Sequence, residues 1–250
     1  MADKILEGRV ALITGASRGI GRALATCFAE HGAHLILTAR TQGALEELDD
    51  ELRAAGHDAP TLVPCDLTDF DTIDKIGGAI YERFKKLDIL IGNAGILGTL
   101  APLAHIEPRE WQQVLDINLT ANWRLIRSMD PLLKASDAGR AVFVTSTVGH
   151  APRSYWGTYA VSKAALEMTA KIYAEECAKT NVRVNLLNPG GTRTDMRAAA
   201  MPGENPEAVK APEALNHLFL ELASPACTAN GAMIEAEQEL AAGHTAYTLK

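Results

Sequence analysis

Short apolar segments alternate with helical patterns along most of the chain. The apolar segments are too short for helices and are bounded by Gly, Pro or polar residues, so we interpret them as buried strands. They cover residues 9–14, 34–40, 61–65, 87–91, 141–145, 182–187 and 231–235. Helical stretches separate them, at residues 22–31, 42–55, 70–86, 108–134 and 212–223. This alternation predicts an α/β fold, a three-layer doubly wound (Rossmann-like) parallel sheet of about seven strands with helices on both faces.

The length and charge of the chain limit its class. At 250 residues, 47% of them hydrophobic, it is long enough for one large domain and too short for two ordinary ones, so we expect a single domain over residues 1–250. The sequence has no run of about 18 apolar residues and no apolar signal segment at its start, which predicts a cytoplasmic protein that makes no membrane contact. A net charge of -7 without a basic cluster argues against a nucleic-acid partner.

The cysteines Cys27, Cys65, Cys177 and Cys227 are scattered along the chain. They form no C-x-x-C pair and have no nearby His at ligand spacing, which argues against a zinc site, a redox motif and a disulfide framework. We therefore expect buried thiols and no metal site.

A glycine-rich segment, T-G-A-S-R-G-I-G at residues 14–21, follows the first predicted strand and opens a helix. In a dinucleotide-binding turn the first glycine allows a tight turn, the second lets the backbone approach a pyrophosphate, and the third permits close packing of helix and strand. The phosphates then lie at the helix N-terminus. The spacing differs from the general G-x-G-x-x-G fingerprint, and such a turn can also simply join a strand to a helix. Its position favours a dinucleotide site, at the switch between the first and fourth strands.

The end of the second predicted strand indicates which dinucleotide is bound. An acid there suits the free 2′-hydroxyl of NAD, whereas a cation suits the 2′-phosphate of NADP. The strand ends in Thr38, Ala39 and Arg40, and Arg18 lies in the glycine-rich segment. Two guanidinium groups would make charge-assisted hydrogen bonds to a phosphate, so we expect NADP(H) to be preferred, with NAD(H) as the alternative. The other interpretation places both arginines on an ordinary surface.

Polar or small residues also follow the third and fourth predicted strands. Asp66 and Leu67 come after the third strand, where they would reach the adenine; alternatively Asp66 or Thr68 caps the next helix. Residues 92–95, Gly-Asn-Ala-Gly, follow the fourth strand, and their small size would let a nicotinamide ribose or another segment approach. A turn alone would also explain Gly95.

Tyr159 and Lys163 lie four residues apart in a predicted helix and therefore project from one face of it. An ammonium group beside the phenol would lower the pKa of Tyr159, so that it could exchange a proton in the neutral range. Ser146 follows the fifth predicted strand, at the sheet edge where open α/β folds bind ligands. An isolated Tyr-x-x-x-Lys match also arises by chance on a solvated helix.

Two further features belong to the expected site. Asn118 lies amid apolar neighbours and must be hydrogen-bonded, either as a structural bridge or within a polar relay. Residues 191–212 are rich in Ala, Met, Pro and Gly and lack sustained periodicity, so we interpret them as a lid over the substrate cleft.

As a set, these motifs resemble the short-chain dehydrogenase/reductase family, in its branch with a Tyr-x-x-x-Lys active site. The matching segments are T-G-A-S-R-G-I-G at 14–21, D-L at 66–67, N-A-G at 93–95, Asn118, Ser146, Y-A-V-S-K at 159–163 and N-P-G at 188–190. They span nearly the whole chain and are jointly highly specific.

The resemblance implies a catalytic group made of Asn118, Ser146, Tyr159 and Lys163. It also implies that a nicotinamide dinucleotide is held by residues at several strand ends. These are Gly15, Ser17, Arg18, Gly19, Ile20, Arg40, Asp66, Leu67, Asn93, Ala94, Gly95, Tyr159, Lys163, Pro189, Gly190, Thr192 and Thr194. A homodimer or homotetramer, built partly through the long helices that contain Asn118 and Tyr159, is a further implication.

One segment departs from the family pattern. Family members commonly have a V-D-G-G-like segment after the last strand, and it often takes part in subunit contacts. Here residues 234–239 read Ile-Glu-Ala-Glu-Gln-Glu. The departure therefore bears on the choice between dimer and tetramer.

The resemblance implies an NADP(H)-dependent oxidoreductase that interconverts a ketone or aldehyde and a secondary alcohol by hydride transfer. Ser146 would polarise the carbonyl, Tyr159 would donate the proton, and Lys163 would lower the pKa of Tyr159 and hold the nicotinamide ribose. The chain keeps the serine and the Tyr-Lys spacing that some enoyl reductases alter, so we expect C=O chemistry. Alternatives are an NAD-linked alcohol dehydrogenase, a non-catalytic NADP-binding sensor and an inert structural subunit.

For the substrate we expect a pocket lined from nearby loops by Leu97, Val148, His150, Arg153, Tyr155, Trp156, Met196 and Met201. These residues predict an apolar pocket with some positive charge, which would suit a carbonyl compound bearing a distant acid. His150 and Arg153 are alternatively solvated loop residues, and both methionines alternatively fill gaps in the core.

Overall fold

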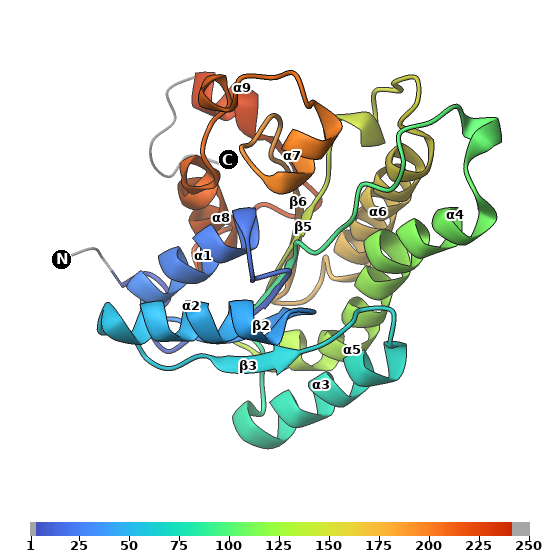
Figure 1. Cartoon of the computed structure of the whole chain (residues 1–250). Helices are drawn as coiled ribbons and strands as arrows, with labels where there is room; N and C mark the ends of the chain where they lie inside the picture. Colours follow the sequence, from blue (N-terminus) through green and yellow to red (C-terminus); the bar gives the residue numbers. More distant parts are fainter. Residues whose placement is uncertain (1–3, 242–250) are drawn as a thin grey trace.

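A parallel sheet forms the centre of the protein (Figure 1), and its strand order is β3-β2-β1-β4-β5-β6-β7. The structure is a computed structural model and describes residues 4–241. The strands are β1 (Val10–Thr14), β2 (His34–Ala39), β3 (Thr61–Pro64), β4 (Ile89–Gly92), β5 (Arg140–Val144), β6 (Arg183–Asn188) and β7 (Met233–Glu235). Every neighbouring pair is parallel. The chain leaves β1 toward β2 and returns on its other side as β4, which confirms the predicted doubly wound fold and its switch point.

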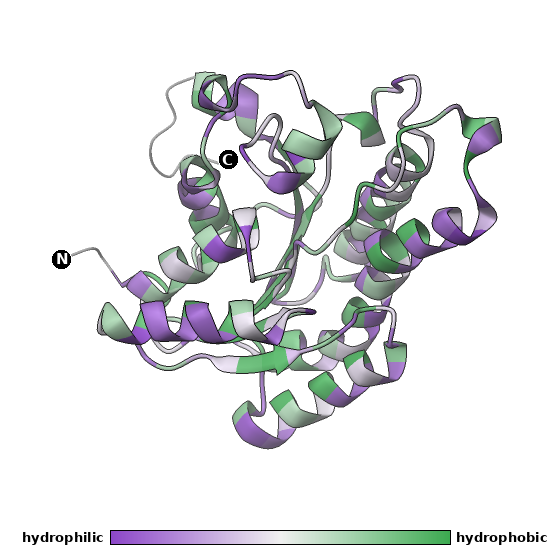
Figure 2. Ribbon diagram, in the orientation of Figure 1, coloured by the Kyte–Doolittle hydropathy of each residue, from purple (hydrophilic) through white to green (hydrophobic). Residues whose placement is uncertain are grey.

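Helices cover both faces of this sheet (Figure 1). On one face lie α1 (Gly19–Glu30), α2 (Gln42–Ala54) and α8 (Asn216–Ala223), and on the other lie α3 (Phe70–Phe84), α5 (Ala121–Ala135) and α6 (Gly157–Glu176). Alternate strand residues face the two layers, so that Ile13 packs with the first group and Leu12 with the second. Figure 2 shows the consequence, with hydrophobic strands at the centre and polar residues on the outer sides of helices.

The helix expected over residues 108–134 is interrupted. It consists of α4 (Pro108–Leu115), a π-helical turn (Asp116–Thr120) and α5. The π turn contains the buried Asn118, whose side-chain hydrogen bonds reach the segment after β4. Single π turns within helices often mark functional sites, because they redirect one side chain or carbonyl.

The chain after β6 differs in detail from the expected lid and helix. Residues 191–212 contain the short helix α7 (Asp195–Ala200) and a 3-10 turn (Pro206–Ala208), and a second 3-10 turn (Pro212–Leu215) precedes α8. A short helix, α9 (Ala236–Ala241), follows β7 and was not expected from the sequence.

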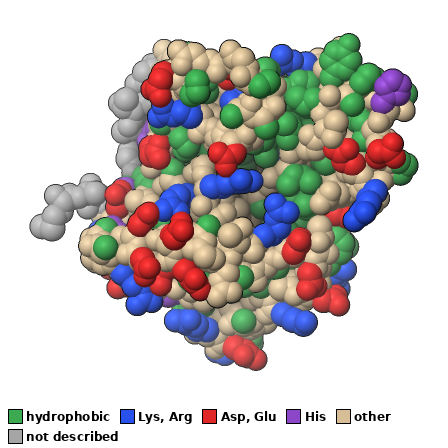
Figure 3. Space-filling view, viewed as in Figure 1, with side chains coloured by type: hydrophobic (Ala, Val, Ile, Leu, Met, Phe, Trp, Pro, Cys, Tyr) green, Lys and Arg blue, Asp and Glu red, His purple; other side chains and the backbone are tan. Residues whose placement is uncertain are grey.

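Within residues 4–241, none of the helices combines the length and apolar character that a membrane span needs. On the face in Figure 3, the described basic and acidic side chains are interspersed, so this face carries no continuous basic surface.

Candidate active site

A cleft of about 920 Å³ lies at the carboxyl ends of the strands, on both sides of the β1–β4 switch point. Residues that follow β1, β2, β3, β4, β5 and β6 form its walls, together with parts of α1, α6 and α7. Every residue that the sequence assigns to cofactor binding lies on these walls. Of the four residues in the expected catalytic group, Ser146, Tyr159 and Lys163 line the cleft, and Asn118 lies behind it.

The glycine-rich loop and the segment after β4 are joined by hydrogen bonds. Thr14 Oγ1 accepts from the backbone N–H groups of Asn93 and Ala94, both at 3.0 Å, and Asn93 Nδ2 donates to Thr14 O at 2.9 Å. Gly15 has a φ of +67°, and a Cβ on Gly21 would collide with the Gly15 carbonyl oxygen. The first and third glycines therefore allow the tight turn and the close packing of α1 that a phosphate-binding loop requires.

Two arginines lie at the end of the cleft expected to hold the adenosine. Arg18 and Arg40 are both exposed on the cleft wall, and Arg18 Nη1 lies 3.0 Å from Asp195 Oδ2 in α7. This ion pair links the glycine-rich loop to the segment after β6 across the cleft. Arg40 contributes to a lowered pKa of Asp66, although the hydrogen bond from the Thr68 N–H is the larger cause.

Asp66 does not cap the following helix, and neither does Thr68. Asp66 Oδ1 accepts from the backbone and side chain of Thr68, at 2.9 and 2.8 Å. The N-cap of α3 is Asp69, which accepts from the N–H of Thr72 at 3.2 Å. The cap prediction was wrong because Asp69, three residues before Thr72, is better placed to satisfy the free N–H groups of the first turn.

Tyr159 is 8% exposed and projects from the start of α6 into the cleft. Burial raises the pKa of Tyr159 to about 12, while a hydrogen bond with Ser146 acts in the opposite direction. The lowered pKa predicted from the Tyr-Lys spacing is therefore wrong for this structure, because desolvation of the phenolate outweighs the effect of the Ser146 hydrogen bond. Tyr159 stays protonated throughout the neutral range, as a proton donor requires.

Lys163 lies one turn further along α6 and is 3% exposed. Its Nζ donates to the Val144 carbonyl at 2.8 Å and lies 5.6 Å from the centre of the Tyr159 ring. Burial lowers the pKa of Lys163 to about 8, and the charge of Glu167 raises it. The ammonium group therefore titrates close to the working range.

Asn118 is fully buried in the π turn. Its Oδ1 accepts from Ile96 N at 2.8 Å, and its Nδ2 donates to Ile96 O at 2.9 Å and to Ser162 Oγ at 3.0 Å. A Cβ on Gly95 would lie 3.2 Å from Asn118 Oδ1 and 3.6 Å from Lys163 Nζ. Asn118 thus bridges to the segment after β4, and Gly95 of that segment lies against both Asn118 and Lys163.

The segment after β6 is held by an internal ion pair and by hydrogen bonds. Arg197 makes two hydrogen bonds of 2.6 Å to Glu204, and Lys210 Nζ donates to Gly191 O at 2.7 Å. Thr194 accepts from Arg197 N at 3.2 Å as the N-cap of α7. The cleft-facing position of Thr194 is therefore set by the local start of that helix.

Of the residues expected to line the substrate pocket, Leu97, Trp156 and Met196 do so. The structure places the others off the cleft wall, namely Val148, His150, Arg153, Tyr155 and Met201. His150 binds acidic side chains behind the cleft, the Arg153 guanidinium lies 5.2 Å from the centre of the Trp156 ring, and Tyr155 is 61% exposed. The positive charge predicted for the pocket from His150 and Arg153 is therefore wrong.

Sequence reasoning missed several residues of the site. Ile96, Ile117 and Asp195 line the cleft, and Glu167 contacts the loop that contains Ser146. Glu167 could have been found, because it follows Lys163 by four residues on the same helix. The others carry no distinguishing local pattern.

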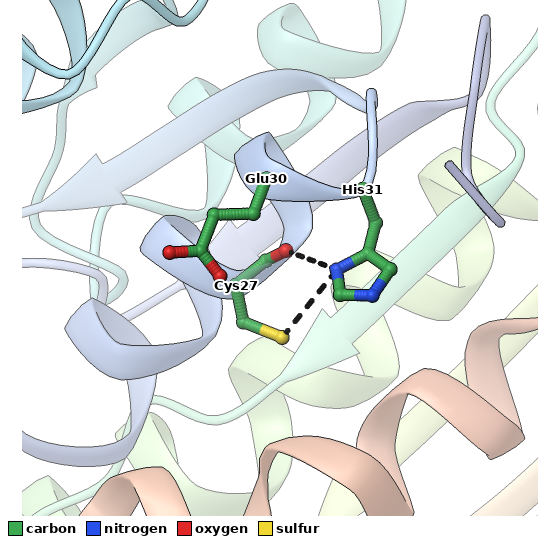
Figure 4. Close-up of side chains that lie close together, drawn as sticks. All are labelled: Cys27, Glu30 and His31. Atoms are coloured by element: carbon green, nitrogen blue, oxygen red, sulfur yellow. Dashed lines mark hydrogen bonds between the residues drawn. The ribbon is translucent and has the colours of Figure 1, made fainter. Parts of the chain in front are cut away.

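A cluster of three possible metal ligands bears on the prediction that the chain has no metal site. Cys27, Glu30 and His31 bring their ligand atoms within 4.8 Å of one another at the end of α1 (Figure 4). His31 does lie at helical spacing from Cys27, four residues away, so the expectation of no nearby His was wrong. However, His31 Nδ1 lies 2.8 Å from the Cys27 carbonyl oxygen, and a carbonyl only accepts. Nδ1 therefore holds a proton, which leaves Nε2 as the one ring nitrogen with a free lone pair, and burial raises the pKa of the Cys27 thiol to about 12, so that it stays protonated. We assign no metal to this group.

Comparisons with known proteins agree with this geometry. A family model described as short chain dehydrogenase matches residues 9–205. The chain is 38% identical over 220 residues to the uncharacterized oxidoreductase YciK of Escherichia coli K12, covering 87% of each chain. It is 34% identical over 193 residues to the 3-oxoacyl-(acyl-carrier-protein) reductase FabG of Escherichia coli K12, covering 77% of each. A short chain dehydrogenase of Shigella flexneri 2a, solved in complex with NADP, matches with a TM-score of 0.91 at 36% identity, covering 94% of this chain and 99% of that one.

Proposed function

Because the chain belongs to the short-chain dehydrogenase family, we propose that it is an oxidoreductase that interconverts a ketone or aldehyde and a secondary alcohol with NADP(H). The observation that carries this proposal is the arrangement of Ser146, Tyr159 and Lys163. Tyr159 is buried and hydrogen-bonded to Ser146 on the cleft wall, with the ammonium of Lys163 one helical turn away.

The residues of the cleft suit a nicotinamide dinucleotide phosphate. Gly15 and Gly21 allow the tight turn and close packing that bring the N-terminus of α1 to the cleft, where it would bind a pyrophosphate. Arg18 and Arg40 would hold the 2′-phosphate, and β2 ends without the acid that would select NAD. The Shigella relative was solved with NADP, which supports the same preference here. When bound, the nucleotide supplies or accepts the hydride.

In this proposal each catalytic side chain has one task. The Ser146 hydroxyl donates a hydrogen bond to the substrate carbonyl oxygen and holds it beside Tyr159. Tyr159 gives its proton to that oxygen as negative charge develops there; its pKa of about 12 keeps the proton in place until then. Lys163 holds the nicotinamide ribose and stabilises the phenolate that forms when Tyr159 gives up its proton. Asn118 holds in place the segment after β4, whose Gly95 lies next to Lys163.

The outer faces of α5 and α6 support an oligomer. Trp123 on α5 is 47% exposed, and Val161, Met168 and Ile172 on α6 are 43%, 59% and 51% exposed. The three α6 residues are spaced by seven and four positions and therefore form one stripe. We infer that this stripe packs against a second copy of the chain. A cytoplasmic location remains a prediction.

The experiment that tests the function is NADPH consumption across a panel of ketones, aldehydes, quinones and acyl thioesters, with identification of the product. We expect NADPH-dependent formation of a secondary alcohol from at least one carbonyl class. The Trp156, Leu97 and Met196 lining favours carbonyls with an apolar group next to the reacting carbon. Tight NADPH binding without turnover of any carbonyl would instead support the sensor, and equal or better turnover with NADH would support the NAD-linked dehydrogenase.

A further inference from the structure

The proposed mechanism leaves one buried acid of the site without a role. Glu167 lies four residues after Lys163 on α6, and its side chain is 7% exposed. A carboxylate is rarely buried unless it is paired or hydrogen-bonded, because desolvation disfavours its charge. The partners of Glu167 therefore indicate what its burial provides.

Three contacts join Glu167 to the loop that contains Ser146. Thr145 Oγ1 donates to Glu167 Oε1 at 2.7 Å, and His150 Nδ1 lies 3.1 Å from the same oxygen. A Cβ on Gly149 would collide with Glu167 Oε1, so the carboxylate packs directly against this backbone. The acid thus holds the residues before and after Ser146 against α6.

His150 joins the loop to a second acid. Its Nε2 lies 3.5 Å from Glu235 Oε1, and Glu235 Oε2 accepts from Asn188 Nδ2 at 2.6 Å. Glu235 belongs to the tail at residues 234–239 that departs from the family pattern. The loop is therefore held between α6 on one side and β7 on the other.

The charge of Glu167 also acts on Lys163. Two titratable groups of α6 act on or lie near the Lys163 ammonium, namely Glu167 through its charge and Tyr159, whose ring centre is 5.6 Å away. Further out, His150 from the loop after β5 contacts Glu167, and Glu235 from β7 contacts His150. Burial lowers the pKa of Lys163, and the charge that opposes this effect is that of Glu167. Without the carboxylate, a lysine that is 3% exposed would lose its proton at lower pH.

We propose that Glu167 is a positioning residue for the reaction, which holds the Ser146 loop against α6, the helix that also carries Lys163. This inference rests on the proposed function. In this proposal the carboxylate of Glu167 positions the Ser146 hydroxyl relative to Tyr159 and Lys163.

Glu167→Gln tests the charge, because the amide keeps the size and can still accept from Thr145. The matched control is Glu235→Gln, which removes a charge from the other side of His150. We expect Glu167→Gln to shift the alkaline limb of the kcat profile toward lower pH by about one unit, with KM for the carbonyl changed less. Glu235→Gln should leave the position of that limb unchanged. Thermal unfolding establishes that both variants are folded.

A second measurement does not depend on turnover. An NMR titration of ¹³C-labelled lysine side chains, with the Lys163 signal assigned from Lys163→Met, gives the pKa of Lys163 directly. We expect it to fall in Glu167→Gln and to stay near the wild-type value in Glu235→Gln. If the wild type reduces no carbonyl, the proposed function fails. The titration still decides whether Glu167 raises the pKa of Lys163.

Glu167→Asp tests the reach of the side chain, since it keeps the charge but withdraws the carboxylate from Thr145 and His150 by one methylene. We expect a lower kcat with a smaller change in the pKa of Lys163 than in Glu167→Gln. The inference is overturned if the kcat profile and the Lys163 titration of folded Glu167→Gln superpose on the wild type. The claim that Glu167 holds the Ser146 loop in place is overturned if Glu167→Asp has the kcat of the wild type. Should Glu167→Gln not fold, the Asp variant decides through the same two readouts.

Discussion

Arg40→Ala is expected to weaken NADPH binding while leaving NADH binding nearly unchanged. Arg40 is exposed on the cleft wall at the end of β2, and Asp66 is a charged neighbour. A hydrogen bond to a charged group contributes about 1.5–3 kcal/mol, and exposure to solvent and salt favours the lower end of that range. Since 1.4 kcal/mol corresponds to a tenfold change, the Kd for NADPH should rise about tenfold.

The assay is nucleotide fluorescence titrated with each cofactor, at two salt concentrations. Higher salt should reduce the difference between the variant and the wild type, because screening weakens an exposed charge pair. Arg53→Ala is the matched control. Arg53 lies on α2 and is exposed like Arg40, but it pairs with Asp49 and does not line the cleft. An equal loss of affinity for NADH and NADPH, or no loss for either, would refute the assignment of Arg40 to the 2′-phosphate.

Three further changes test other parts of the structure. Gly21→Ala should destabilise the protein by about 2 kcal/mol and weaken NADPH binding, since the added Cβ meets the Gly15 carbonyl; thermal unfolding and nucleotide titration measure both. Met168→Glu should shift the protein to a smaller species in light scattering, because it places a charge in the exposed apolar stripe of α6; an unchanged mass would place the subunit contact elsewhere. Burial alone would raise the pKa of Asp88, but hydrogen bonds from Ser136 and Val10 hold it below its ordinary value of 3.8. Ionised Asp88 therefore contributes its full stabilisation above pH 3.8, and this contribution is lost as the pH falls through the lower pKa of the folded state. Denaturant unfolding should show that Asp88→Asn destabilises the protein by about 3 kcal/mol at pH 7. The stability of the variant should also depend less on acid pH than that of the wild type.

The sheet was predictable because its five inner strands are buried on both faces and therefore appear as continuous apolar segments. The position of Ser146 at the end of β5, and of the glycine-rich turn at the end of β1, followed from the same pattern. The interruption of the helix at Asn118 was not predictable, since the π turn depends on hydrogen bonds to Ile96, far along the chain. Local periodicity contains no information about such partners.

The errors at the site have the same origin. His150 was assigned to the substrate pocket from its place in a loop, but its partners Glu167 and Glu235 come from α6 and β7. The spacing of Tyr159 and Lys163 was sufficient to place them together, yet it contains no measure of burial. In the structure burial decides the pKa of both groups, upward for the phenol and downward for the ammonium.

The central claim is that Tyr159 donates the proton in carbonyl reduction, and Tyr159→Phe tests it most directly. The measurement pairs the Kd for NADPH with kcat/KM for the best carbonyl substrate found in the panel. General acid catalysis contributes about 10²–10⁴-fold, so kcat/KM should fall by at least about 100-fold while the Kd stays within about threefold of the wild type. Activity of the folded variant within a few-fold of the wild type would contradict the account.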